Sequence, residues 1–189
     1  MGRWEPNARG RLEQAALELY VERGYAQTTV AEIAARAGLT ERTFFRHFAD
    51  KREVLFGGAG TLQELMTGAV ADAPEPASPI DAVAAALQTA GAMFQERREA
   101  VLRRQSVIAA NPELQERELI KLATLGSALA EALRRRGVTD PAASLAAESG
   151  VAVLRIAFEQ WIGDTGQAEL PQLMRASLEE LRALTSALR

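Results

Sequence analysis

Two helix-start signals lie close together near the N-terminus, at Thr29 and Thr40, and they constrain the fold more than any other feature. Thr29 is followed three residues later by Glu32, the spacing of a capping box, and Gly38 ends the short apolar face that begins there. The two helices delimited in this way have about two turns each, too few for a helix to be stable alone. They must therefore pack against each other and against the helical segment at 11–23. This pattern predicts a helix-turn-helix, whose second helix can lie in the DNA major groove.

The second short helix separates its aromatic residues from its polar ones. Phe44 and Phe48 are four residues apart, so we expect them to share a buried face. Arginine can bind guanine in a bidentate manner, and threonine can bind phosphate or contact the thymine methyl group. The opposite face offers such groups at Thr40, Glu41, Arg42, Thr43, Arg46 and His47. The alternatives are a solvated face for Arg42 and a favourable charge at the helix N-terminus for Glu41.

The stretch "TTVAEIAARAGLTERTFFRHFADKREVLF" resembles the DNA-binding domain of the TetR family of transcriptional regulators, in which "T...IA..AGVS..TLYRHF..K..L" recurs. The resemblance covers about residues 8–56, and the rest of the chain agrees only in length and helical content. It implies that Thr43 contacts a base or a phosphate and that Phe45 flanks the DNA backbone. It also implies that three further residues lie near phosphates, namely Thr29, His47 and Lys51.

Phe45 departs from the family pattern, which usually has tyrosine at this position. The hydroxyl bond to phosphate is therefore missing, and contact with a sugar or a thymine methyl group remains. Two of the implied phosphate contacts have alternatives: His47 can bond the last carbonyls of its helix, and Lys51 can be a solvated cation.

The remaining sequence predicts helices and no strands, because no segment alternates apolar and polar residues with period two. We expect an all-α fold of about nine helices: a three-helix DNA-binding domain over 1–52 and a larger helical ligand-binding and dimerisation domain over 53–189. The fourth helix is expected to start beyond Asp50 and to run towards Val70. The glycines within 57–60 would then lie inside it, either as a hinge or where another helix packs closely.

Composition argues against several classes of protein. With no cysteine and one histidine, disulfides, thiolate metal sites and histidine-rich metal centres within one chain are excluded. No phosphate-binding loop or nucleophile elbow is present, so we expect neither an enzyme nor a cofactor. No apolar run approaches the roughly 20 residues that span a bilayer, and the N-terminus lacks the apolar core of a secretion signal. We therefore expect a cytoplasmic protein without a membrane partner.

The charge is unevenly distributed along the chain. Of 22 Lys and Arg and 25 Asp and Glu, residues 1–52 hold 9 and 7, a net +2, which leaves 13 and 18, a net −5, for residues 53–189. The predicted DNA-binding domain is thus the basic part, although chance scatter of surface charge explains an asymmetry of this size as well.

Apolar residues of the C-terminal domain predict two sites. A ligand pocket would be lined by Leu62, Met66, Met93, Phe94, Phe158 and Trp161, with Arg97, Gln105 and Arg155 as polar residues. The alternative for Arg155 is an ion pair with Glu148, Glu159 or a neighbouring helix. A homodimer interface on the last two helices would use Leu154, Phe158, Leu170, Met174, Leu178, Leu181 and Leu184. The alternative is that these apolar stripes pack within one chain.

Together these features predict a ligand-responsive transcriptional regulator. In this hypothesis a homodimeric repressor binds an inverted-repeat operator in double-stranded DNA, and a small, largely apolar effector releases it. A helical adaptor that binds another protein, and an enzyme that processes a small molecule, are the alternatives from other classes.

Overall fold

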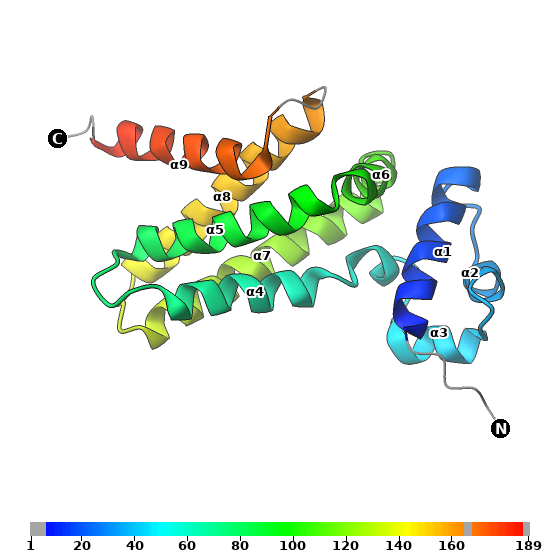
Figure 1. Ribbon diagram of the computed structural model, residues 1–189. Coiled ribbons are helices and arrows are strands. Elements are labelled where there is room, and N and C mark those ends of the chain that lie inside the picture. The colour runs from blue at the N-terminus through cyan, green and yellow to red at the C-terminus, as the bar shows by residue number, and fades with distance from the viewer. Residues whose placement is uncertain (1–6, 165–167, 187–189) are drawn as a thin grey trace. The chain divides into compact units, whose positions relative to one another are not determined.

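The computed structural model describes residues 7–164 and 168–186, and all regular structure in these ranges is helical. The nine α-helices and one 3₁₀ helix are labelled in chain order, most of them in Figure 1. They are α1 (Ala8–Arg23), α2 (Val30–Arg36), α3 (Glu41–His47), η1 (Glu53–Phe56), α4 (Ala59–Asp72), α5 (Pro79–Glu96), α6 (Arg98–Ala109), α7 (Pro112–Arg135), α8 (Ala142–Gly163) and α9 (Leu170–Ser186). The predicted all-α fold of nine helices is confirmed for the described residues.

The predicted caps explain where the short helices begin. The Thr29 hydroxyl accepts from the backbone N–H of Glu32, and the Glu32 carboxylate accepts from the backbone N–H of Thr29, which completes the capping box. Thr40 caps α3 in the same way by accepting from the backbone N–H of Thr43. Ser78 caps α5, whose first residue is Pro79. Each cap uses residues three apart in the sequence, so local sequence alone predicts it.

The prediction of one helix from beyond Asp50 towards Val70 is wrong. The Asp50 carboxylate accepts from the backbone N–H groups of Arg52 and Glu53, and the short helix η1 follows and ends at Phe56. Gly57 and Gly58 then form a turn, and α4 starts only at Ala59. Adjacent glycines cost more conformational entropy in a helix than other residues, so the chain leaves the helix at this point.

The described residues form two compact units. Unit 1 combines the residues up to Ala59 with Glu99–Leu119, and unit 2 combines Gly60–Arg98 with the residues from Ile120 onwards. Unit 1 thus contains α1 to α3 and η1 together with most of α6 and the start of α7. The division at 52/53 that the sequence suggests stays a prediction.

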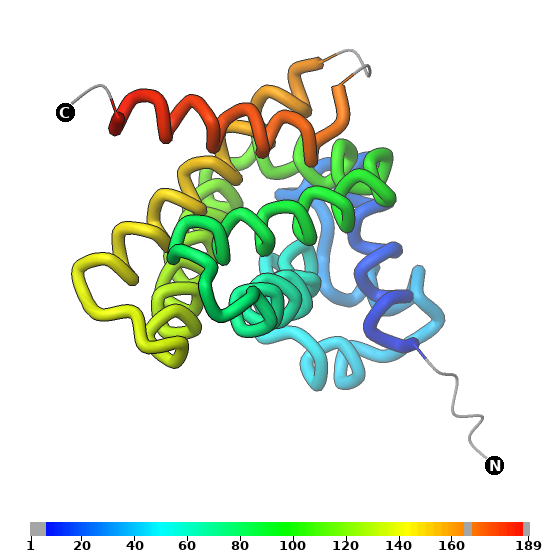
Figure 2. Tube along the Cα trace, turned by 60° about the vertical axis from the view of Figure 1, so that its left-hand side comes forward, coloured from blue at the N-terminus to red at the C-terminus, as the bar shows by residue number. Residues whose placement is uncertain are grey.

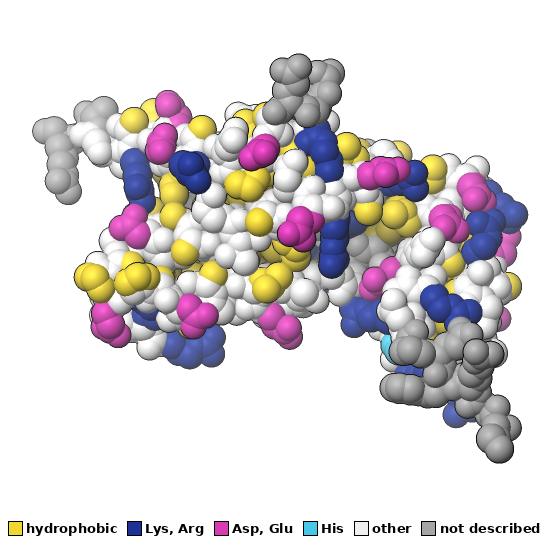
Figure 3. Space-filling view, in the orientation of Figure 1, with side chains coloured by type: hydrophobic (Ala, Val, Ile, Leu, Met, Phe, Trp, Pro, Cys, Tyr) yellow, Lys and Arg dark blue, Asp and Glu magenta, His cyan; other side chains and the backbone are white. Residues whose placement is uncertain are grey.

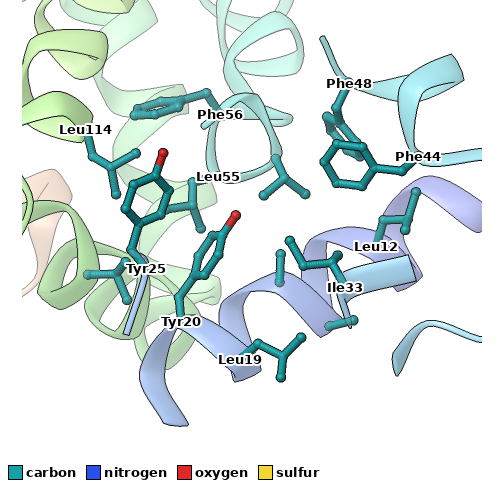
Figure 4. Close-up of a cluster of buried hydrophobic side chains, with 14 of the residues drawn as sticks. Leu12, Leu19, Tyr20, Tyr25, Ile33, Phe44, Phe48, Leu55, Phe56 and Leu114 are labelled. Carbon is teal, nitrogen blue, oxygen red and sulfur yellow. The ribbon is translucent and has the colours of Figure 1, made fainter. Parts of the chain in front are cut away.

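A continuous apolar cluster fills unit 1 (Figure 4). Phe44 and Phe48 are both buried, as predicted, and their rings lie 5.5 Å apart. The cluster extends beyond the three N-terminal helices, because Ile108 of α6 and Leu114 of α7 are completely buried in it. Short helices need such tertiary packing, so the segment 99–119 completes the core of the predicted DNA-binding part.

Three long helices, α5, α8 and α9, pack side by side in unit 2, as the views of Figures 1 and 2 show. Glycine permits the close approach at two points. A Cβ atom on Gly91 would lie 3.0 Å from Met174 Sδ and 3.2 Å from the backbone of Pro171, and one on Gly150 would meet the Val83 side chain. None of the described helices is long and apolar enough to cross a membrane.

Candidate nucleic-acid interface

The turn between α2 and α3 has the geometry of a helix-turn-helix. Gly38 adopts a left-handed conformation with φ 66°, which glycine tolerates without steric cost. The backbone N–H of Leu39 donates to the Ala34 carbonyl at 2.8 Å and that of Gly38 to the Ala35 carbonyl at 3.0 Å. These bonds satisfy the end of α2, and α3 starts immediately afterwards at its Thr40 cap.

The face of α3 opposite Phe44 is exposed. Phe45 has 54% of its surface exposed and lies edge-on to Phe44, with the ring centroids 5.5 Å apart. Arg42 and Arg46 are exposed as well. Within the described part of the chain, neither guanidinium group has an ion-pair or hydrogen-bond partner. Both arginines can therefore bind an acceptor on DNA without first breaking an internal contact.

Other arginines of unit 1 are held by internal contacts. Arg36 of α2 bonds the Glu22 carboxylate of α1 at 2.9 Å and lies 3.5 Å from Glu18. The hydrogen bond from Arg36 lowers the pKa of Glu22 below its ordinary value. Arg11 donates to the Ala37 carbonyl at the end of α2. Sequence spacing predicts none of these pairs, since they join residues of different helices. In contrast to Arg36 and Arg11, the two arginines of α3 have no such partner among the described residues.

The hydroxyl groups of the predicted threonine contacts are already engaged. The Thr29 hydroxyl donates to Glu32 Oε2 at 2.9 Å and serves as the cap of α2. The hydroxyl oxygens of Thr40 and Thr43 lie 3.1 Å apart, and Thr43 is half-buried. Contacts of these threonines with phosphate or a base stay predictions, and for Thr29 a phosphate would have to share the hydroxyl with Glu32.

Lys51 is bound inside unit 1. Its Nζ donates to the carbonyls of Tyr25 at 3.0 Å, Thr28 at 3.2 Å and Ala26 at 3.4 Å, and it lies 4.3 Å from the centroid of the Tyr25 ring. An ammonium group has three N–H donors, so all of them have a partner here. Burial raises the pKa of Tyr25 to about 12. This geometry favours a structural role for Lys51 over the implied phosphate contact.

His47 is half-buried at the C-terminal end of α3. Its Nε2 atom is buried and has no hydrogen-bond partner, and its ring lies 6.4 Å from that of Phe48. A phosphate contact through Nε2 would require the ring to turn outwards, so this contact stays a prediction.

The residues of the predicted ligand pocket are only partly brought together. Gln105 belongs to unit 1, where its Nε2 donates to Glu118 at 3.4 Å, whereas all the others belong to unit 2. Arg155 is exposed and pairs with Glu159 at 3.1 Å, which is the alternative considered for it. Within unit 2, Met66 and Trp161 are fully buried, Arg97 is exposed, and four residues are half-buried: Leu62, Met93, Phe94 and Phe158.

Most residues of the predicted dimer interface face the interior of one chain. Leu154, Leu170, Met174 and Leu178 are buried where α9 packs on α5 and α8. Phe158 and Leu181 are half-buried, and Leu184 is 62% exposed. The apolar stripes of α8 and α9 thus pack largely within the chain, because one helical face cannot both fill the core and contact a partner. Among the described residues of these two helices, the large apolar side chains that are exposed are Leu145, Ile156 and Leu184.

Charge on unit 2 shows no single sign. On the face seen in Figure 3, acidic and basic side chains are interspersed with apolar ones. Within the described residues, no group of three or more histidine, aspartate or glutamate side chains could hold a metal ion.

Two family profiles match the chain. The profile of the bacterial regulatory proteins of the tetR family matches residues 13–56, which include α2, α3 and η1. The profile of the MftR C-terminal domain matches residues 77–186, more than half of the chain.

Curated proteins and solved structures agree with these profiles. The chain is 26% identical to the mycofactocin biosynthesis regulator MftR of Mycobacterium tuberculosis, over 87% of this chain and 84% of that protein. It is 38% identical to the regulator TcmR of Streptomyces glaucescens over 42% of this chain, a match that spans only 35% of TcmR.

Among solved structures, the SmeT–triclosan complex superposes with a TM-score of 0.67 at 20% identity, covering 94% of this chain and 90% of that one. FadR of Bacillus subtilis in complex with stearoyl-CoA superposes with a TM-score of 0.60 at 21% identity, covering 90% and 95%.

Proposed function

Because the chain belongs to the TetR family of bacterial transcriptional regulators and carries a C-terminal domain of the MftR type, we propose that it is a repressor whose operator binding is controlled by a small molecule. The family makes it a DNA-binding transcriptional regulator and not an enzyme. The finer proposal is a homodimer that binds an inverted-repeat operator and is released by a small, largely apolar effector. A cytoplasmic location stays a prediction.

One observation supports the proposed DNA-binding surface: the outer face of α3 has two exposed arginines, Arg42 and Arg46. By contrast, Arg36 of α2 pairs with Glu22, and Arg11 of α1 donates to the Ala37 carbonyl. A side chain that must first break an ion pair loses part of its binding free energy, whereas a side chain without an ion pair does not. Arginine also binds guanine O6 and N7 in a bidentate manner, which discriminates bases by about 1–3 kcal/mol. Recognition helices contact base edges with their N-terminal residues, and the position of Arg42 near the start of α3 supports such a role for it.

The effector part of the proposal is supported by related structures. FadR was solved with stearoyl-CoA and SmeT with triclosan, so proteins of similar fold bind ligands with large apolar parts. Unit 2 of this chain offers half-buried apolar side chains at Phe94 and Phe158, which stack edge-on with centroids 5.7 Å apart. An effector can release DNA only through different affinities for the two states of the regulator.

Selection of duplexes from a randomised library with the full-length protein tests the DNA-binding proposal. We expect the enriched sequences to form an inverted repeat. Arg42→Ala should lose about 1–3 kcal/mol on the selected operator and relax the preference at one base position. Arg135→Ala, an exposed arginine at the end of α7, is the matched control and should bind like the wild type. Equal binding by Arg42→Ala across the library would remove α3 from the recognition surface.

Sedimentation of variants tests the homodimer. The exposed apolar residues of α8 and α9 should lie in the interface, so replacing Ile156 and Leu184 together by glutamate should yield monomers that have lost operator binding. Val21→Glu changes an equally exposed apolar residue of α1 and should leave the dimer intact. If the double variant still sediments as a dimer, the interface lies elsewhere.

A further inference from the structure

Among the described residues of unit 2, two buried hydrogen-bond donors have no partner. Trp161 is completely buried in α8, and its indole N–H meets no acceptor. Arg98 lies at the start of α6, and its Nη1 is also buried without an acceptor. Buried donors without a partner are rare in folded proteins, because each has lost its bonds to water. Two of them on side chains in contact call for an explanation.

The other half of the Arg98 guanidinium explains why this side chain is held there. Arg98 Nη2 donates to the Trp161 carbonyl at 3.2 Å and to the Asp164 carbonyl at 3.1 Å, which caps the C-terminal end of α8. The same guanidinium lies over the indole ring, with Cζ 4.5 Å from the ring centroid. The cap and the stacking fix the side chain, so Nη1 is held in place beside Trp161.

Three acceptors close in sequence to this pair are committed to other groups. The Asp164 carboxylate accepts from the backbone N–H of Ala168 at 2.7 Å, and Gln95 Oε1 accepts from that of Leu170 at 3.0 Å. Glu99, the next residue after Arg98, pairs with Arg103 at 2.6 Å. Among the described residues, no carboxylate forms an ion pair with Arg98. Within the described residues, the positive charge is therefore met by two backbone carbonyls and the indole ring, and by no carboxylate.

Two further aromatic rings form a chain of contacts with the Trp161 ring. The Phe158 ring lies 5.8 Å from that of Trp161, and the Phe94 ring lies 5.7 Å from that of Phe158. Phe94 and Phe158 are half-buried, so part of each is available to an apolar molecule, whereas Trp161 presents its N–H from within. The Trp161 side chain therefore has apolar aromatic neighbours that are open to contact with a ligand.

We propose that Arg98 Nη1 and Trp161 Nε1 bind the carboxylate of an amphiphilic effector whose apolar body contacts Phe94 and Phe158. The inference rests on the proposed ligand-responsive function and names the chemical class of the ligand. A carboxylate fits because it only accepts hydrogen bonds, offers two oxygens and supplies the negative charge that Arg98 lacks. A neutral alcohol of the same length would bring neither the charge nor a second acceptor.

Fluorescence of Trp161 provides a direct test. The chain has one other tryptophan, Trp4, which lies outside the described residues, so the full-length Trp4→Phe variant reports on Trp161 alone. We would titrate it with hexanoate, decanoate and dodecanoate and with the matching alcohols. At least one carboxylate should change the emission in a saturable way, and its alcohol should bind about tenfold more weakly or worse. If no carboxylate binds, or if acid and alcohol bind equally, the proposal is wrong and the donors are satisfied by buried water.

Substitutions separate the site from general effects on folding. Arg98→Met should reduce carboxylate affinity about tenfold or more, whereas Arg135→Met, which removes an exposed arginine of the same unit outside the predicted pocket, should not. Because Arg98 also caps α8, Trp161→Phe is a second variant that keeps an aromatic ring and removes only the N–H, with binding followed by calorimetry. Unchanged affinity in both folded variants would overturn the assignment.

Operator binding is measured separately, so that the two proposals fail independently. Carboxylate binding that leaves operator affinity unchanged would keep the site and count against the ligand-controlled repressor. Release of the operator by a compound that does not need Arg98 and Trp161 would keep the repressor and reject the site.

Discussion

Unit 1 combines an apolar cluster with short helices whose ends are fixed by side chains bonded to distant backbone carbonyls, whereas unit 2 has long helices that approach closely at glycines. Similar bonds to carbonyls occur in unit 2 from Arg98 and Arg136. In unit 1, Lys51 bonds three carbonyls, the Tyr20 hydroxyl donates to the Lys51 carbonyl at 2.6 Å, and Arg104 donates to that of Leu55 at 2.7 Å. In unit 2, Gly91 and Gly150 let α5, α8 and α9 approach closely. Helices of two turns bury too little surface to fix their own ends, so polar contacts must do so.

The comparison also shows how the predicted DNA-binding surface of unit 1 differs from the predicted dimer interface of unit 2. The α3 face depends on side chains that point outwards from a helix held by its caps and by Phe44, so sequence periodicity identifies it. The residues of unit 2 lie on helices with apolar residues on several sides, so periodicity does not say which stripe faces the core. Four of the seven expected interface residues are buried for this reason.

The largest effect is expected from the aromatic core of unit 1. Phe44 is completely buried and Phe45 is 54% exposed, although the two are neighbours. Phe44→Ala should lower the free energy of unfolding by about 3–5 kcal/mol through lost burial and a residual cavity. Phe45→Ala is the matched control and should change stability by less than about 0.5 kcal/mol, because it is a surface substitution. Urea unfolding of the full chain measures both, and equal losses would contradict the separation of faces.

A smaller effect on stability is expected at Lys51, and it tests how much polar contacts contribute to unit 1. Lys51→Met removes three hydrogen bonds to carbonyls and should lower the free energy of unfolding by about 1–3 kcal/mol. The matching change at an exposed cation of the same unit, Arg46→Met, should leave stability nearly unchanged and weaken DNA binding.

The salt dependence of operator binding distinguishes the two roles of Lys51. If Lys51 binds phosphate instead, Lys51→Met would leave stability unchanged and lower the slope of log affinity against log salt by about 1. If Lys51 has a structural role, Lys51→Met should lower the free energy of unfolding and leave the slope of log affinity against log salt unchanged.

The smallest effect concerns acid stability at the turn before η1. A hydrogen bond from Arg52 is the largest cause that lowers the pKa of Asp50, and the backbone N–H groups of Arg52 and Glu53 add to it. A carboxyl whose folded pKa is depressed stabilises the protein above its unfolded pKa of about 3.9, and this stabilisation is lost as the pH falls through the folded pKa.

Asp50→Asn should therefore cost at most about 1 kcal/mol at neutral pH, since the pair is largely solvent-exposed. The difference from the wild type should shrink as the pH falls below about 4. Unfolding at a series of pH values measures it, and a difference independent of pH would mean that the charge of Asp50 is not what stabilises the turn.

The error at the fourth helix shows a limit of reasoning from local patterns. Residues 53–70 contain enough apolar residues for one helix, but the Asp50 carboxylate accepts from the backbone N–H of Glu53 where the short helix η1 begins, and the chain turns at Gly57 and Gly58. Gly57 receives a bond at its carbonyl from Arg9, 2.6 Å away, and a Cβ there would meet the Glu13 side chain. Contacts with α1 thus help to place the turn. A hinge at these glycines stays a prediction.

The amino-acid sequence by itself determined the helical class, the caps of α2, α3 and α5, and the helix-turn-helix with its exposed arginines. Each of these depends on residues within about four positions of one another, where backbone hydrogen bonds and caps act. Tertiary structure alone decided that Lys51 bonds backbone carbonyls of unit 1 and that Arg36 forms an ion pair with Glu22. It also decided that Leu178 is buried and that Arg98 stacks on Trp161. These contacts join residues far apart in the chain, and burial and pairing depend on which surfaces come together in the fold.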